Sequence, residues 1–197
     1  MQRTIKLLDQ LIAKYETNLG LPHRKSPLEA GSTALDLSLF THLDIRVGNL
    51  TEIWKHPAST KLWCERIDLG EGTSREVATG LQQHRTEEEM KGLVLVVANL
   101  PAKTVAGFSS NGMILCVTKG EDIYPLRPPA GSVVGERVGL GKGLGQSEFL
   151  PKLEADFWEK ALPHLHTDSQ GQACFGDQVF TTSAGTVTSS LQDALLS

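Results

Sequence analysis

The chain has 197 residues, of which 40% are hydrophobic and 21% charged, and its formal net charge at pH 7 is −4. This length allows one domain with a substantial core and an appended element. The negative charge argues against nucleic-acid binding driven by bulk electrostatics, because backbone affinity comes from neutralised phosphates. No apolar run approaches the roughly 20 residues of a membrane span, and no secretory leader opens the chain, so we expect a soluble cytoplasmic protein.

The acidic excess is not confined to a tail. Residues 1–41 contain 5 of the 19 basic and 4 of the 23 acidic residues, which leaves 14 basic and 19 acidic residues in 42–197. The three cysteines, Cys64, Cys116 and Cys174, are far apart and flanked by apolar sequence. An odd number at such spacings favours reduced thiols in or near the core over a disulfide or zinc framework.

Residues 1–20 are predicted to contain an amphipathic helix. Between residues 4 and 19, apolar side chains recur at spacings of three and four, which places them on one stripe: Ile5, Leu8, Ile12, Tyr15 and Leu19. The stripe suits either docking on the same chain or pairing with a helix of a partner. Residues 21–41 contain prolines, a glycine and small polar residues without a period, and they are predicted to be a linker.

After residue 41 the pattern changes to strands. Residues 43–48, 63–70 and 75–81 alternate or are rich in β-formers, and Gly48 indicates a bulge or bend. Thr86 and Glu89 have capping-box spacing and predict a short helix. Residues 93–100 and 112–118 are apolar throughout and predict buried strands. This order favours a mainly β protein with a five-stranded Greek-key barrel of the OB-fold over residues 42–140.

Residues 141–197 are predicted to form a small C-terminal α/β element. A glycine-rich stretch precedes residues 152–162, where Leu153, Phe157 and Ala161 repeat every fourth residue as on a helix face. Short strand-like pieces follow in "QACFGD", "QVFTTS" and "GTVTSS".

The sequence contains no persuasive catalytic, metal or cofactor motif. His164 and His166 stand two residues apart without further ligands at a known spacing, so a structural corner is favoured over a metal site. The glycines of "GLGKGLG" are not followed by the Lys and Ser or Thr of a phosphate loop. Residues 87–89, three glutamates, suit a helix N-terminus better than a catalytic pair.

Cationic and small polar residues at the turns and strands of the barrel remain as candidate nucleic-acid contacts. The cations that suit phosphates are Arg46, Lys55, Lys61, Arg75 and Lys103. The residues that suit bases or sugars are Asn99, Ser110, Asn111 and Met113. Each of the basic residues, taken singly, also suits a solvated surface.

The segments "LDIRVG", "KHPASTKLW", "ERIDLGEG", "LVVANL", "SSNGMILC", "LRPPAGSVVGERV" and "WEKALPHLHTD" resemble, in order and spacing, the tRNA-binding domain family of endothelial monocyte-activating polypeptide II. The resemblance covers residues 42 to about 182. It implies a non-catalytic OB-fold barrel that recognises the tRNA elbow by shape and assists aminoacyl-tRNA synthetases, alone or in a multi-synthetase complex. It also implies a long eukaryotic form whose C-terminal element covers the surface used for dimerisation in bacteria, hence a monomeric barrel. The expected partners are tRNA and a synthetase, the latter reached through residues 4–19.

The chain departs from this family at two places. Ala58, Ser59 and Thr60 stand where relatives usually carry an acidic loop, and residues 104–106 stand where they commonly carry a Lys and an Arg. Each lost phosphate contact lowers the salt slope by about 0.7 to 0.9 units. The alternative is therefore a protein-interaction scaffold or cytokine-like module with weak or lost RNA binding. The cytokine activity of some relatives is not expected here, because Asn49 and Glu52 differ from the pattern associated with it.

Overall fold

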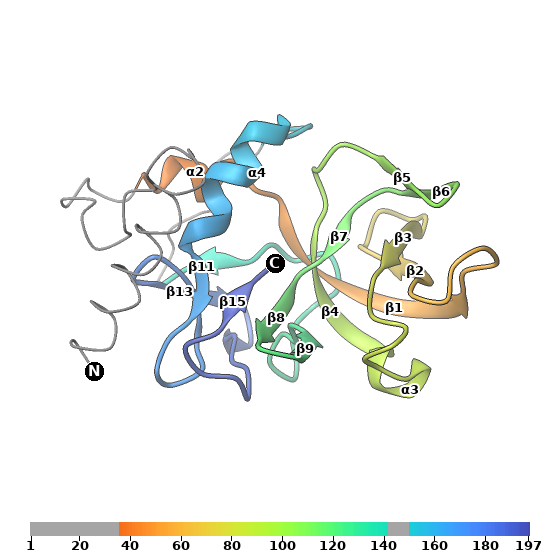
Figure 1. The fold of residues 1–197 in the computed structure, drawn as a ribbon. Coiled ribbons are helices and arrows are strands. Elements are labelled where there is room, and N and C mark those ends of the chain that lie inside the picture. The colour runs from red at the N-terminus through yellow and green to blue at the C-terminus, as the bar shows by residue number, and fades with distance from the viewer. Residues whose placement is uncertain (1–35, 142–149) are drawn as a thin grey trace, which may run out of the picture. The chain divides into compact units, whose positions relative to one another are not determined.

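The computed structural model describes residues 36–141 and 150–197 (Figure 1). The helix predicted over residues 4–19 and most of the glycine-rich stretch after residue 140 lie outside these ranges. In the part that is described, no helix is long and apolar enough to cross a lipid bilayer.

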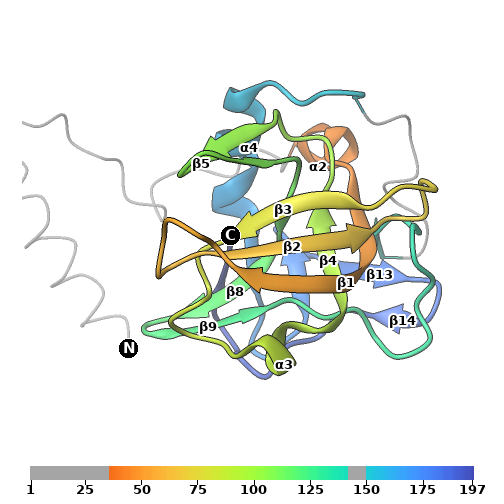
Figure 2. The same cartoon turned by 90° about the vertical axis from the view of Figure 1, so that its right-hand side faces the viewer.

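The first sheet contains five antiparallel strands of the described chain, and its first strands in chain order, β1 (Ile45–Lys55), β2 (Trp63–Asp68) and β3 (Arg75–Thr79), lie side by side in Figure 2. In spatial order they are β3 (Arg75–Thr79), β2 (Trp63–Asp68), β1 (Ile45–Lys55), β4 (Gly92–Val97) and β7 (Met113–Ile114). Its two edges nearly meet: the backbone N–H of Asn111 donates to the carbonyl of Glu76 at 2.8 Å. The prediction of a mainly β, five-stranded OB-fold barrel is confirmed.

Strand β1 is longer than the sequence pattern predicted, because Gly48 does not end it. The strand pairs with β4 as far as Leu50, shifts register between Leu50 and Glu52, and continues along β2 to Lys55. A Cβ atom at Gly48 would lie 2.6 Å from Cγ2 of Ile67. Only glycine therefore fits at this position without moving the side chains of the neighbouring strand. The bend expected at Gly48 occurs instead at the bulge between Leu50 and Glu52. With this bulge, the same strand pairs with β4 as far as Leu50 and with β2 as far as Lys55.

The barrel core is filled by the inward-facing residues of these strands. Trp63, Ile67 and Leu69 follow the predicted alternation and are each no more than 5% exposed. Glu65 belongs to the same inward row and is fully buried. Helix α3 (Glu87–Met90) has the predicted capping box, with Thr86 and Glu89 bonding each other's backbone, and it buries Met90.

A second sheet joins the end of the barrel sequence to the C-terminal element. Its path runs through β10 (Gly139–Leu140), β13 (Gln178–Thr182), β12 (Ala173–Phe175), β11 (Leu165–Thr167), β15 (Leu195–Leu196), β8 (Cys116–Lys119) and β9 (Asp122–Pro125), while β14 (Gly185–Thr186) pairs with β13. The single strand predicted over residues 112–118 is therefore two strands, β7 and β8, divided at Leu115. The chain ends in this sheet, where Ser197 and Cys116 exchange two backbone hydrogen bonds of 2.9 and 2.7 Å.

The remaining described elements are short helices and a hairpin. Helix α2 (Ser38–His42) overlaps the end of the predicted linker, residues 21–41, but its Phe40 is 1% exposed and packs on the rings of Phe175 and Phe180. Helix α4 (Ala155–Ala161) leads into the 3-10 helix η1 (Leu162–His164). Strands β5 (Lys103–Val105) and β6 (Phe108–Ser110) form a separate hairpin. The domain limits at residues 41 and 140 stay predictions, since packing and strand pairing cross both.

Candidate nucleic-acid interface

The loop between β1 and β2 is built around His56. Its backbone N–H donates to the carbonyl of Leu62 at 3.1 Å, and its Nδ1 accepts from the N–H of Ala58 at 3.0 Å. The His56 side chain is nearly buried, with the residue 6% exposed. The loop is therefore held from inside, and it carries Lys55 and Lys61 exposed at the rim of one shallow hollow.

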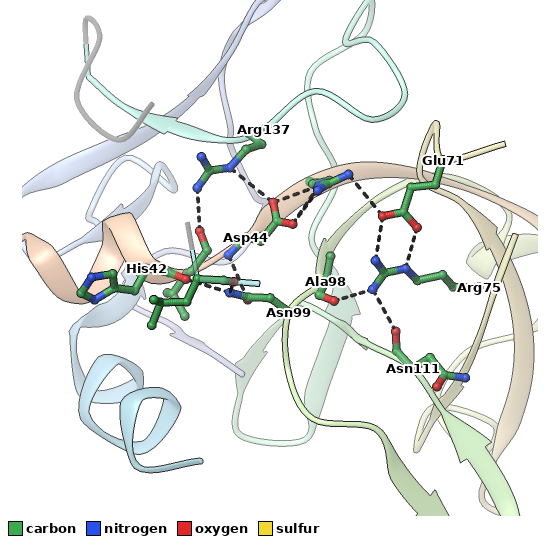
Figure 3. Close-up of polar contacts among 11 residues, drawn as sticks. His42, Asp44, Glu71, Arg75, Ala98, Asn99, Asn111 and Arg137 are labelled. Carbon is green, nitrogen blue, oxygen red and sulfur yellow. Dashed lines mark hydrogen bonds and ion pairs between the residues drawn. The ribbon is translucent and has the colours of Figure 1, made fainter. Parts of the chain in front are cut away.

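Arg75 lies in a second hollow, but its guanidinium is already engaged (Figure 3). Its Nε and Nη2 donate to the two carboxylate oxygens of Glu71, both at 2.7 Å. Its Nη1 donates to the carbonyl oxygens of Ala98 and Asn111. Because Arg75 donates these hydrogen bonds to Glu71, the pKa of that carboxyl is lowered. Arg75 thus fastens the β2–β3 loop to the barrel edge.

The same network continues through Arg46 to the start of β1. Arg46 donates from Nε to both carboxylate oxygens of Asp44 at 2.9 Å and lies 3.3 Å from Glu71. Hydrogen bonding to Asp44 raises the pKa of Arg46. Arg137 pairs with Asp44 at 3.3 Å and donates to the carbonyl of Leu43. Three arginines and two carboxylates alternate in this row, so a phosphate that approaches Arg46 or Arg75 competes with an internal partner.

Asn99 is 4% exposed and joins three chain segments. Its Oδ1 accepts from the N–H of Asp44 at 3.0 Å, and its Nδ2 donates to the carbonyls of His42 and Leu150 at 2.8 and 2.9 Å. These bonds occupy both amide hydrogens. The geometry therefore gives Asn99 a structural position behind the surface, and its contact with RNA stays a prediction.

Ser110 likewise bridges strands at the barrel's closing edge. Its hydroxyl accepts from the N–H of Ala78 and donates to the carbonyl of Gly112, both at 3.0 Å. Asn111 is exposed beside it, and its side-chain amide makes only long contacts, 3.4 and 3.5 Å, with backbone carbonyls. Met113 is partly buried and lines the adjoining groove.

Three of the predicted cations are exposed and make no ion pair within residues 36–141 and 150–197: Lys55, Lys61 and Lys103. Lys152 is also exposed, beside Arg75, and the sequence patterns did not single it out. The structure thus collects Arg75, Asn111 and Lys152 in one hollow, Lys103 and Met113 in the next, and Lys55 and Lys61 around the first loop.

Trp158 is a second side chain in this region, besides Lys152, that sequence reasoning missed. It lines the groove with Lys103 and Met113, although it belongs to α4 in the C-terminal element. A signal was present: Leu153 and Ala161 are buried on the apolar face of this segment, and Trp158 falls off that periodicity. A large aromatic residue outside the apolar stripe is a candidate for a second contact surface.

Comparison with known proteins identifies the family. A family model described as a putative tRNA binding domain matches residues 45–137. The crystal structure of the C-terminal domain of Plasmodium vivax p43 superposes with a TM-score of 0.76 and 34% identity, covering 80% of this chain and 98% of that one. The chain belongs to the tRNA-binding domain family. The resemblance found in the sequence motifs is thereby confirmed.

Two curated relatives of this tRNA-binding domain protein are longer proteins. A probable methionine–tRNA ligase of Oryza sativa subsp. japonica is 36% identical over 73% of the chain. Aminoacyl tRNA synthase complex-interacting multifunctional protein 1 of Cricetulus griseus is 31% identical over 77% of the chain. The chain spans 18% and 42% of their lengths, respectively. It carries a tRNA-binding domain of the kind associated with aminoacyl-tRNA synthetases and their cofactors.

Proposed function

We propose that this chain is a non-catalytic module that binds tRNA at its elbow by shape and supports an aminoacyl-tRNA synthetase in the cytoplasm. The observation that carries the proposal is the set of exposed lysines at the rims of the first loop and the β5–β6 hairpin. Lys55, Lys61 and Lys103 lie on a barrel of the tRNA-binding domain family, and all three offer a charge that no described carboxylate neutralises.

The electrostatics favour binding of modest strength. Arg46 and Arg75 already hold Asp44 and Glu71, and the whole chain carries a formal charge of −4. Weak binding still serves a synthetase if the two proteins are tethered, because a high effective concentration raises the apparent affinity without new contacts. The predicted helix over residues 4–19 is the proposed tether, and the barrel itself is proposed to be monomeric.

The decisive experiment is binding of unfractionated tRNA across a salt series. A Lys55→Ala, Lys61→Ala, Lys103→Ala variant should bind more weakly, with a salt slope smaller by about 0.7 to 0.9 units for each contact removed. The matched control replaces Lys91, Lys119 and Lys160, which already bond acceptors within the chain, and changes the net charge equally. Equal losses in both variants would mean that only bulk charge matters and that no lysine site exists.

A second candidate function is a protein-interaction scaffold that retains the fold with little RNA affinity. The specific observation in its favour is the internal pairing of Arg46, Arg75 and Arg137 in an acidic chain. Under this alternative the intact protein binds no tRNA even at low salt, whereas it still captures a purified synthetase.

A further inference from the structure

A groove runs between the barrel and helix α4, beside the hollow that contains Arg75. We call it the α4 groove, and its main lining residues are Leu100, Pro101, Lys103, Val105, Met113 and Trp158. Residues 100–102 also line the hollow of Arg75 and Lys152, so the two depressions share a wall. The groove therefore continues the proposed RNA surface from the barrel onto the C-terminal element.

The hairpin that forms one wall of the groove is fixed from behind. Phe108, at the start of β6, packs edge-on against Trp54, with ring centroids 6.0 Å apart, and against His56 at 6.2 Å. Three backbone-paired positions then align β6 with β5, including Lys103 opposite Ser110. The hydroxyl of Ser110 also bonds the backbone of Ala78 in β3 and of Gly112, which precedes β7. These contacts hold the hairpin in place at both of its ends.

The lining combines an indole, a thioether and aliphatic groups with two exposed charged groups, the ammonium of Lys103 and the carboxylate of Glu159. Trp158 and Met113 offer the polarizable apolar contacts on which a nucleobase stacks. Lys103 makes no ion pair within the described residues and can therefore bind a phosphate of the occupant, which a nucleotide has and an apolar peptide side chain lacks. A base within a duplex cannot enter such a groove, because its faces are already stacked.

We propose that the α4 groove receives one unpaired nucleotide of the bound RNA, with its base against Trp158 and its phosphate at Lys103. The proposal rests on the proposed RNA-binding function and adds to it a preference for RNA that has an unpaired nucleotide. An RNA with a single-stranded end binds more tightly than the same duplex with blunt ends, and the C-terminal element, not only the barrel, contributes the contact.

The test compares one short RNA duplex in blunt form and with a single-stranded 3′ extension, each bound to the full chain and to variants. Base stacking on an aromatic residue changes affinity by roughly 5- to 150-fold, so the wild-type preference for the extended form should fall by a factor in this range in Trp158→Leu. Trp158→Phe should retain most of it. The salt slope should not change in Trp158→Leu, since no cation is removed, whereas Lys103→Ala should lower it by about 0.7 units.

Two further variants distinguish the loss of the groove contact from unfolding of the protein and from a general effect of removing an aromatic residue. Met113→Ala alters the groove from strand β7, leaves Trp158 in place and should lose part of the same preference. Tyr124→Leu removes a partly buried aromatic residue from β9, where it stacks under Arg85 at 3.6 Å, and should leave the preference intact. Thermal melting confirms that each variant is folded at the binding temperature.

An unchanged preference in Trp158→Leu and Met113→Ala overturns the groove proposal while the lysine variant can still support tRNA binding. The same holds if the wild type binds both RNA forms equally. If the wild type binds neither RNA nor tRNA at low salt, the proposed function fails, and this proposal fails with it.

Discussion

The carboxyl group of Glu65 lies inside the barrel and accepts a hydrogen bond of 2.6 Å from the hydroxyl of Thr79 on the neighbouring strand. Burial raises the pKa of Glu65 from its ordinary value of 4.5 to about 8, and the bond from Thr79 opposes this shift only in part. The folded barrel therefore holds a proton that the unfolded chain releases near pH 4.5.

This proton makes stability depend on pH. Between about pH 4.5 and 8 the native state binds more protons than the unfolded state, so the free energy of unfolding should fall as pH rises and level off above pH 8. Glu65→Gln keeps an acceptor for Thr79 and removes the titration. Its stability advantage should be small at pH 5 and reach on the order of 3 to 5 kcal/mol at pH 8, at about 1.4 kcal/mol per pKa unit. Denaturant titrations at several pH values measure it, and an advantage that does not vary with pH would refute the assignment.

Gly48→Ala should destabilise the barrel by about 1 to 3 kcal/mol, the usual cost of overpacking a core. The added Cβ would lie 2.6 Å from Ile67 and 2.8 Å from Leu69, both of which are buried. Gly80→Ala is the matched control, because a Cβ there meets nothing within 4 Å, and its effect should stay within about 0.5 kcal/mol. Urea unfolding of the two variants measures the difference in stability. Equal stabilities would show that the side chains of Ile67 and Leu69 move aside without cost.

Gly48 also shows where prediction from the sequence reached its limit. Alternation and apolar runs placed the barrel strands, and the capping-box spacing of Thr86 and Glu89 placed helix α3, because these signals are local. The continuation of β1 through Gly48 depends on the close approach of Ile67, which is a contact between strands. Similarly, the lysines of the first loop follow from the loop's sequence, whereas the engagement of Arg46 by Glu71 joins residues far apart in the chain.

Asn99→Ala should lower stability by about 2 to 4 kcal/mol while leaving tRNA affinity of the folded protein unchanged. The change leaves the N–H of Asp44 and the carbonyls of His42 and Leu150 without their present partner, and each unsatisfied buried group costs about 1 to 3 kcal/mol. Asn111→Ala, at an exposed position, should have little effect on stability. Thermal melting and tRNA titration are run on both variants; a stable Asn99→Ala protein with weakened tRNA binding would instead support the predicted contact.

The carboxylate of Glu71 pairs with two partly exposed arginines, Arg46 and Arg75, so its negative charge competes with a phosphate for both. Its Oε1 lies 2.7 Å from Arg75 and 3.3 Å from Arg46, and Arg75 lines the hollow that Asn111 and Lys152 share.

Glu71→Gln keeps an oxygen that accepts from Arg75 and removes the negative charge that competes with phosphate. We expect tRNA to bind about two- to tenfold more tightly, with a salt slope steeper by about 0.7 to 0.9 units for each arginine that gains a phosphate. Glu121→Gln, in the exposed turn between β8 and β9, changes the net charge equally and is the matched control. A salt series of tRNA titrations separates the two effects. An equal gain in both variants would assign the effect to bulk charge, whereas a gain confined to Glu71→Gln would show that an internal carboxylate limits how strongly this barrel binds RNA.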